Sequence, residues 1–178
     1  MDNIFKQVKD HGTFTWADLG DIKEGRGSLG EEMPVLVYRL MQFTMLDVLT
    51  KKYGREQADI LLRESGHLAG SEFARNALDL TLDLDNFVSN LQMTLQNLKV
   101  GILRIESINN DASEIILTVG EDLDCSGLPI TGERVCNYDE GFIAGILEVY
   151  TGKPFTVREV DCWADGNRIC RFRCTMGK

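Results

Sequence analysis

Three cysteines and one glutamate in the C-terminal part of the sequence constrain the fold of this chain most strongly. Glu159, Cys162 and Cys170 form the pattern Glu-x-x-Cys-x₇-Cys around a turn predicted at Asp165-Gly166. Cys136 comes earlier, at the predicted start of a helix that can fold back onto this turn. Thiolates and a carboxylate that converge in this way make a closed four-ligand site for a borderline divalent ion. Zinc is the first candidate.

The same residues allow other interpretations. A buried cysteine is often only a small hydrophobic residue, and Cys162 and Cys170 could pair as a disulfide across two strands under oxidation. In a regular strand Glu159 and Cys162 point to opposite faces, so a bulge is required if both are to bind one ion. We interpret Cys125 and Cys174 as cysteines outside the site.

Composition narrows the class of protein. The 178 residues suit a single compact domain, and the net charge of −9 argues against nucleic acid as the main partner. No apolar run is long enough for a membrane span, and the N-terminus has no apolar signal core, so we expect a cytoplasmic protein. In a reducing cytoplasm, five cysteines favour metal binding over disulfides.

Periodicity predicts helices, then a hairpin, then a helix and a second hairpin. Residues 1–30 are interrupted by glycines and read as an arm or loop, followed by one domain over residues 31–178. We expect a well-buried first helix between Pro34 and Gly54, and a third helix capped by Asp85. The predicted helices and strands are, in order, helices 34–53, 55–76 and 85–98, strands 101–108 and 114–119 around a turn at 109–111, helix 134–150, and strands 155–163 and 168–175. This order predicts an α+β fold with an antiparallel sheet and packed helices.

Gly66 and Gly70 lie four residues apart inside the second predicted helix. Each glycine costs about 1 kcal/mol of helix stability relative to alanine. We therefore expect a helix or a ligand to approach the backbone closely at this point.

The chain contains no recognisable catalytic constellation. The serines have no His-plus-acid partners in a nucleophile pattern, the glycines form no phosphate loop, and no site for a hydride donor is visible. The sequence therefore favours a protein that is not an enzyme. An apolar pocket between helices and sheet is the usual site for a small ligand. Residues expected near it, each with core packing as the alternative role, are Phe43, His67, Phe73, Phe87, Met93, Asn97, Phe142 and Tyr150.

Several segments between Val135 and Phe172 resemble the 4-vinyl reductase domain, which occurs as a standalone protein and as the sensor domain of phenol-responsive transcriptional activators. The matching segments are Val135-Cys136, Gly141-Phe142-Ile143-Ala144-Gly145, Gly152-Lys153-Pro154, Arg158-Glu159-Val160-Asp161-Cys162 and Gly166-Asn167-Arg168-Ile169-Cys170-Arg171-Phe172. A looser match at Ser65-Gly66-His67-Leu68-Ala69-Gly70 extends the resemblance to roughly residues 35–176.

The resemblance implies a structural zinc ion held by Cys136, Glu159, Cys162 and Cys170. It also implies a homodimer, and a fold like that of transport-particle subunits and haem–nitric-oxide-binding domains. The function we expect is binding of a small hydrophobic molecule without transforming it, as a sensor or carrier. Two alternatives are a reductase acting on the vinyl group of a tetrapyrrole, which rests on the family name, and a dimeric assembly adaptor.

Overall fold

The computed structural model describes residues 14–109 and 113–177, and the chain divides into a short N-terminal unit and a larger one. The first unit, Met1–Glu31, contains the 3₁₀-helix η1 (Trp16–Leu19) and one helical turn, α1 (Ile22–Gly25). Asp21 caps α1 by accepting a hydrogen bond from the Glu24 amide at 2.9 Å. Of the predicted arm, residues 1–13 lie outside the described residues.

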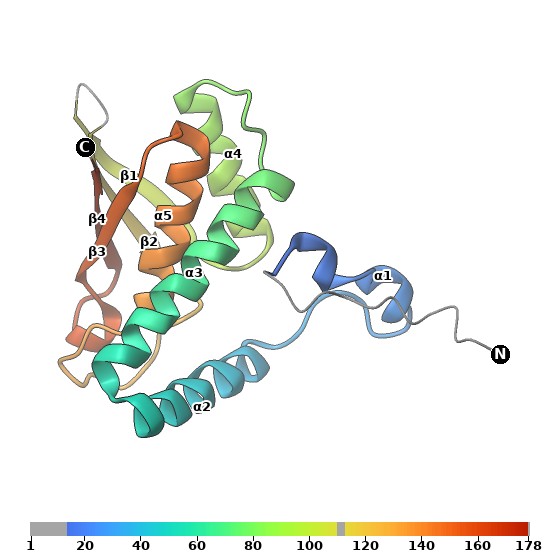
Figure 1. The fold of residues 1–178 in the computed structure, drawn as a ribbon, viewed down its shortest axis with the longest axis vertical. Helices are drawn as coiled ribbons and strands as arrows, with labels where there is room; N and C mark the ends of the chain where they lie inside the picture. The colour runs from blue at the N-terminus through green and yellow to red at the C-terminus, as the bar shows by residue number, and fades with distance from the viewer. Residues whose placement is uncertain (1–13, 110–112, 178) are drawn as a thin grey trace. The chain divides into compact units, whose positions relative to one another are not determined.

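The second unit, Glu32–Lys178, has four helices and four strands among its described residues (Figure 1). The elements are α2 (Val35–Tyr53), α3 (Arg55–Ala77), α4 (Leu84–Asn97), β1 (Ile102–Ile108), β2 (Glu114–Gly120), α5 (Asn137–Thr151), β3 (Phe155–Asp161), η2 (Trp163–Asp165) and β4 (Cys170–Met176). The strands form an antiparallel sheet in the order β1-β2-β4-β3. The predicted fold class is therefore confirmed. The turn expected between β1 and β2 falls partly on residues 110–112, which are not described.

Helices α4 and α5 pack on the sheet, and α3 lies along α5 (Figure 1). Strand β4 alternates buried and less buried residues, with Cys170, Phe172 and Cys174 turned into the core and Arg173 exposed. One face of the sheet therefore carries the apolar interior, whereas the other presents charged pairs such as Arg171 with Glu106 at 2.8 Å.

Glycines on two helices allow α3 and α5 to approach closely. A Cβ added at Gly66 would lie 2.0 Å from the carbonyl oxygen of Tyr138, and one at Gly70 would lie 2.0 Å from that of Phe142. Gly141 on α5 approaches the carbonyl of Arg63 in the same way. The expected close approach at Gly66 and Gly70 is confirmed, and the approaching element is a helix.

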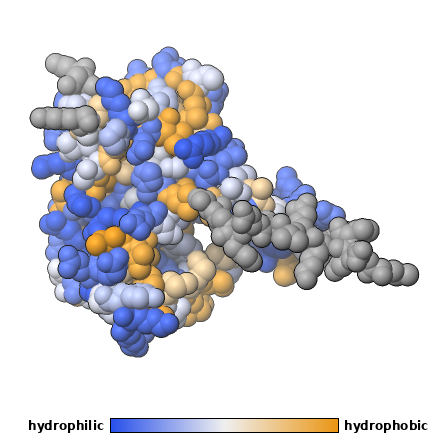
Figure 2. All heavy atoms as spheres, in the orientation of Figure 1, coloured by the Kyte–Doolittle hydropathy of each residue, from blue (hydrophilic) through white to orange (hydrophobic). Residues whose placement is uncertain are grey.

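The first helix differs from expectation. We expected α2 to be well buried, but it contains no buried residue. Its apolar side chains point outward on more than one face, and the exposed ones are Val35, Leu36, Val37, Leu40, Met41, Met45 and Val48. The prediction was wrong because periodicity identifies apolar faces and does not tell whether the same chain covers them. Figure 2 shows hydrophobic residues, in orange, at the surface among hydrophilic ones.

Smaller differences concern the ends of elements. Asp83, not Asp85, caps α4, with its carboxylate accepting from the Asn86 amide at 3.0 Å. Helix α5 begins at Asn137, three residues later than predicted, and ends as expected at Gly152, which has a left-handed backbone with φ 70°. No helix in residues 14–109 and 113–177 is both long and apolar enough to cross a bilayer.

Candidate functional site: a cysteine cluster beside an apolar cavity

Four cysteines from four separate segments meet in the interior of the second unit. Cys125 lies in the loop between β2 and α5, Cys136 is the N-cap residue of α5, Cys162 follows β3, and Cys170 begins β4. Each is at most 1% exposed, and their four sulfurs all lie within 4.8 Å of one another. All five cysteines of the chain are free thiols. The cluster can therefore hold a metal ion, and the predicted convergence of Cys136, Cys162 and Cys170 is confirmed.

The spacing of the sulfurs suits a tetrahedral ion. The Cys136 sulfur lies 3.9 Å from that of Cys162 and 3.8 Å from that of Cys170. With zinc–sulfur bonds of about 2.3 Å, the edge of a regular tetrahedron of sulfurs is about 3.8 Å. The fourth sulfur, of Cys125, is only 3.0 Å from that of Cys170, so this edge would lengthen on binding.

Cys125 is the residue that sequence reasoning missed. We expected both Cys125 and Cys174 to lie outside the site, and only Cys174 does: it is absent from the cluster, and burial raises the pKa of its thiol to about 12. Cys125 belongs to no short cysteine motif and sits in a loop whose path depends on tertiary contacts. Its only signal in the sequence is a further cysteine a short way before Cys136.

Glu159 lies against the cluster but outside the group of mutually close ligand atoms. The register of β3 against β4 shifts between Glu159 and Asp161, which is the bulge that the sequence required for Glu159 and Cys162 to face one place. Glu159 Oε2 accepts a hydrogen bond from the Cys136 amide at 3.2 Å. Its Oε1 is buried and has no hydrogen-bond partner among the described residues. Burial, with the nearby Cys162, raises the pKa of this carboxyl to about 8.

The electrostatics of the cluster call for a cation. Hydrogen bonds shared with Cys125, Cys162 and Cys170, together with burial, raise the pKa of the Cys136 thiol. Several thiolates cannot coexist in such a site unless a positive ion compensates them. A soft or borderline cation supplies that charge and displaces the thiol protons. The donor set, its burial and its spacing therefore fit zinc.

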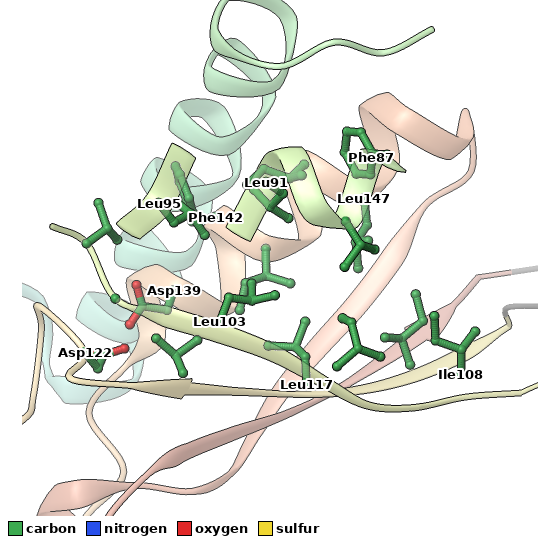
Figure 3. Close-up of a pocket in the computed structure, with 18 of the residues that line it drawn as sticks. Phe87, Leu91, Leu95, Leu103, Ile108, Leu117, Asp122, Asp139, Phe142 and Leu147 are labelled. Carbon is green, nitrogen blue, oxygen red and sulfur yellow. The ribbon is translucent and has the colours of Figure 1, made fainter. Parts of the chain in front are cut away.

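An apolar cavity of about 50 Å³ lies beside the cluster, enclosed by α4, α5 and strands β1 and β2 (Figure 3). Its walls are made almost entirely of aliphatic and aromatic side chains. Those labelled in Figure 3 are Phe87, Leu91, Leu95, Leu103, Ile108, Leu117, Phe142 and Leu147. The carboxylates of Asp122 and Asp139 lie together at one end. Burial, with Asp124 and Asp122 nearby, raises the pKa of Asp139 well above its usual range.

Two of the eight pocket residues expected from the sequence line this cavity, Phe87 and Phe142. Two others support the walls from behind, since Tyr150 stacks on Phe87 with ring centroids 3.7 Å apart and Phe73 packs on Phe142 at 5.3 Å. The remaining four do not line it. They are Phe43, His67, Met93 and Asn97.

The positions of these four residues follow from the helices that carry them. Met93 and Asn97 are on the exposed side of α4. His67 faces the surface of α3, where its Nε2 lies 3.0 Å from Glu148 Oε2, and Phe43 is on α2 beside a separate shallow depression. The sequence missed the true lining because it is assembled from aliphatic residues of four elements that are distant in sequence.

The fold and the two sites define a class: an α+β domain that joins a buried cysteine cluster to an apolar cavity. Residues 115–176, from β2 through β4, match the family model of the vinyl-4-reductase (V-4-R) domain. The chain is 29% identical over 148 residues to the uncharacterised protein MJ1642 of Methanocaldococcus jannaschii, covering 83% of this chain and 81% of that protein. The resemblance to the 4-vinyl reductase domain family that the sequence motifs predicted is thereby confirmed.

Solved structures agree. A vinyl-4-reductase family protein from Methanocaldococcus jannaschii superposes with a TM-score of 0.58 at 16% identity, covering 84% of this chain and 85% of that one. The phenol-responsive sensory domain of the transcription activator PoxR gives 0.58 at 16% identity, with coverages of 83% and 76%.

The wider fold prediction is also confirmed. Subunit 3 of the trafficking protein particle complex from Naegleria fowleri matches with a TM-score of 0.65 at 12% identity, covering 81% of this chain and 95% of that one. An H-NOX protein from S. oneidensis gives 0.51 at 11% identity, with coverages of 91% and 95%. At these identities the likeness concerns the fold alone.

Proposed function

We propose that this protein binds a small hydrophobic molecule in the cavity between α4, α5 and the sheet, without transforming it. The observation that carries the proposal is the lining of the cavity, which is apolar except for Asp122 and Asp139 at one end. Enclosed apolar spaces with a few polar groups are the usual sites for small ligands. A sensor or a carrier would use such a site.

Two neighbours in the fold comparison support the class of ligand. The PoxR sensory domain was crystallised with phenol, and the trafficking subunit carries covalently bound palmitic acid. Both ligands are largely apolar. The ligand of the present chain is a separate matter, because the identities are 16% and 12%.

The size of the cavity separates this proposal from its alternatives. An engineered apolar cavity of about 150 Å³ holds benzene, so the present space of about 50 Å³ must widen to admit a ring. A tetrapyrrole is far larger still, and the cavity gives no support to the reductase alternative. A pure assembly adaptor, by contrast, has no use for a cavity and is expected to have a filled interior.

We further propose that the cysteine cluster holds a structural zinc ion. Cys136, Cys162 and Cys170 supply three ligands, and a fourth protein ligand completes a closed shell without an open position for a reacting molecule. In this role zinc contributes to folding free energy and not to chemistry. A cytoplasmic location accords with five unpaired thiols.

The third part of the proposal is a homodimer formed through α2. This helix exposes seven aliphatic and methionine side chains that the chain itself leaves uncovered. An apolar patch of this kind on a soluble protein is typical of a protein–protein interface. The resemblance to the sensor domains points to a second copy as the partner.

Ligand binding is tested by filling the cavity. Leu91 lines the cavity from α4, whereas Met93 on the same helix is 59% exposed and outside it. We expect Leu91→Phe to abolish binding of benzene and phenol probes in ligand-observed NMR and to remove any compound that native mass spectrometry finds with the wild-type protein. Met93→Phe adds the same ring at the surface and should leave both unchanged. The proposal is wrong if wild-type protein binds no probe and carries no compound, or if both variants behave alike.

A further inference from the structure

Five side chains are available for the four positions around a tetrahedral ion. Cys136, Cys162 and Cys170 occupy three positions under either assignment. The fourth falls to Glu159, as the family resemblance implies, or to Cys125, which the structure places among the other three sulfurs. The geometry around the two candidates differs in three respects.

The first difference is distance. The Cys125 sulfur is 3.0 Å from that of Cys170 and within 4.8 Å of the other two. The carboxylate oxygens of Glu159 do not satisfy that mutual limit. A sulfur already inside the group needs only a small outward shift to reach the tetrahedral edge of about 3.8 Å.

The second difference is how each residue is held. Asp122 Oδ1 accepts hydrogen bonds from the amides of Asp124 at 2.8 Å and Cys125 at 3.0 Å, which folds the loop into a tight turn. Arg39 on α2 donates to the carbonyl oxygens of Leu123 and Ser126, each at 2.9 Å. The loop is thus fixed by protein contacts, and it presents the Cys125 thiol, which is 0% exposed, to the other cysteines.

The third difference is that Glu159 already has a partner. Its Oε2 accepts from the amide of Cys136 at 3.2 Å, and its own amide donates to Glu140 Oε1 at 2.8 Å. These contacts anchor the bulge of β3 to the start of α5. In this position Glu159 orients the backbone of a ligand, which is the work of an outer-sphere group.

We propose that Cys125, and not Glu159, is the fourth ligand, so that the shell consists of Cys125, Cys136, Cys162 and Cys170. Glu159 is then a positioning residue that fixes the Cys136 amide. This inference rests on the proposed function to the extent that it requires the structural metal. It departs from the three-cysteine, one-glutamate set that the family resemblance implies.

The direct test uses the wild-type protein. X-ray absorption spectroscopy at the zinc edge distinguishes four sulfur neighbours at about 2.3 Å from three sulfurs and one oxygen at about 2.0–2.2 Å. We expect four sulfurs. Three sulfurs with one oxygen overturn this inference alone, and a purified protein that binds no zinc overturns the metal in the proposed function together with it.

A second test compares three variants by competition with a zinc chelator. Loss of an outer-sphere partner typically lowers metal affinity about 10–100-fold, so Cys125→Ala should lose more than about 100-fold and Glu159→Gln no more than about that range. Cys174→Ala removes a thiol that is equally buried but outside the cluster, and should leave the affinity unchanged. The reverse order, with Glu159→Gln the more damaging and Cys125→Ala equal to Cys174→Ala, overturns the inference. The wild-type spectrum decides the matter if Cys125→Ala does not fold.

Discussion

At the scale of single residues, glycine decides how closely α3 and α5 pack. Each helix contributes a pair spaced four residues apart, Gly66 with Gly70 and Gly141 with Gly145, and each of the four meets backbone atoms of the other helix. Backbone cannot move aside as the end of a flexible side chain can. A methyl group at these positions therefore forces the helices apart.

The glycine contact predicts an opposite effect to that of helix propensity. Gly141→Ala would place a Cβ 2.0 Å from the Arg63 carbonyl oxygen. Overpacking costs about 1–3 kcal/mol, which exceeds the gain of about 1 kcal/mol from alanine in a helix. We expect a net loss of unfolding free energy in urea titration. Gly25→Ala, in α1 where a Cβ meets nothing within 4 Å, is the control and should lose nothing. Equal stability of both variants would contradict the packing argument.

The cysteines allow a second prediction at this scale. Cys162 and Cys174 are both 0% exposed, but only Cys162 belongs to the cluster. Because structural zinc contributes binding free energy to the folded state, Cys162→Ala should lower the melting temperature well beyond Cys174→Ala. An excess of chelator should remove most of this difference by destabilising the wild type. A melting temperature of Cys162→Ala that equals that of Cys174→Ala would mean that no metal stabilises the fold.

At the scale of elements, the sequence predicted the strands and most helices because each has a clear apolar period and a chemical stop. Gly54 and Gly152 end α2 and α5 as expected, and the strands pair as predicted. Environment was the harder part. The apolar faces of α2 and of α4 look similar in sequence, yet α4 has three buried residues and α2 has none. Which face meets its own chain depends on tertiary packing, which periodicity does not contain.

The exposed face of α2 predicts a subunit interface. Leu40 is 57% exposed, so Leu40→Glu removes no contact from the core of its own chain. We expect the wild-type protein to sediment as a dimer and Leu40→Glu to sediment as a folded monomer, because a buried unpaired carboxylate opposes association. Leu98→Glu, at an equally exposed leucine after α4, should remain dimeric. A wild-type monomer at high concentration would refute the interface.

At the scale of the whole molecule, the candidate site was predictable where it depends on local spacing. The hairpin brings Cys162 and Cys170 together, and the helix start adds Cys136, so these three could be inferred from sequence. Cys125 and most of the cavity lining could not. Their proximity arises only when the loop after β2 closes over the sheet and α4 covers β1.

The adjacency of the two sites predicts that metal and ligand influence each other. Asp122 holds the Cys125 amide and also lines the cavity. Coupling free energies of about 1–3 kcal/mol are typical between linked sites. We expect zinc removal to weaken binding of a phenol probe by about 5–150-fold, and the probe to strengthen zinc binding by the same factor, as linkage requires. Calorimetric titration in each order measures both. Identical probe affinity with and without zinc would show that the sites are independent.

The short loop from Asp122 to Cys125 therefore gives this protein a dependence that neither site has alone. A cell short of zinc would hold a chain whose chamber has lost its end wall, and such a chain would ignore its small molecule even at saturating supply. Trace-metal status and the response to a hydrocarbon would then be read by one domain as a single quantity.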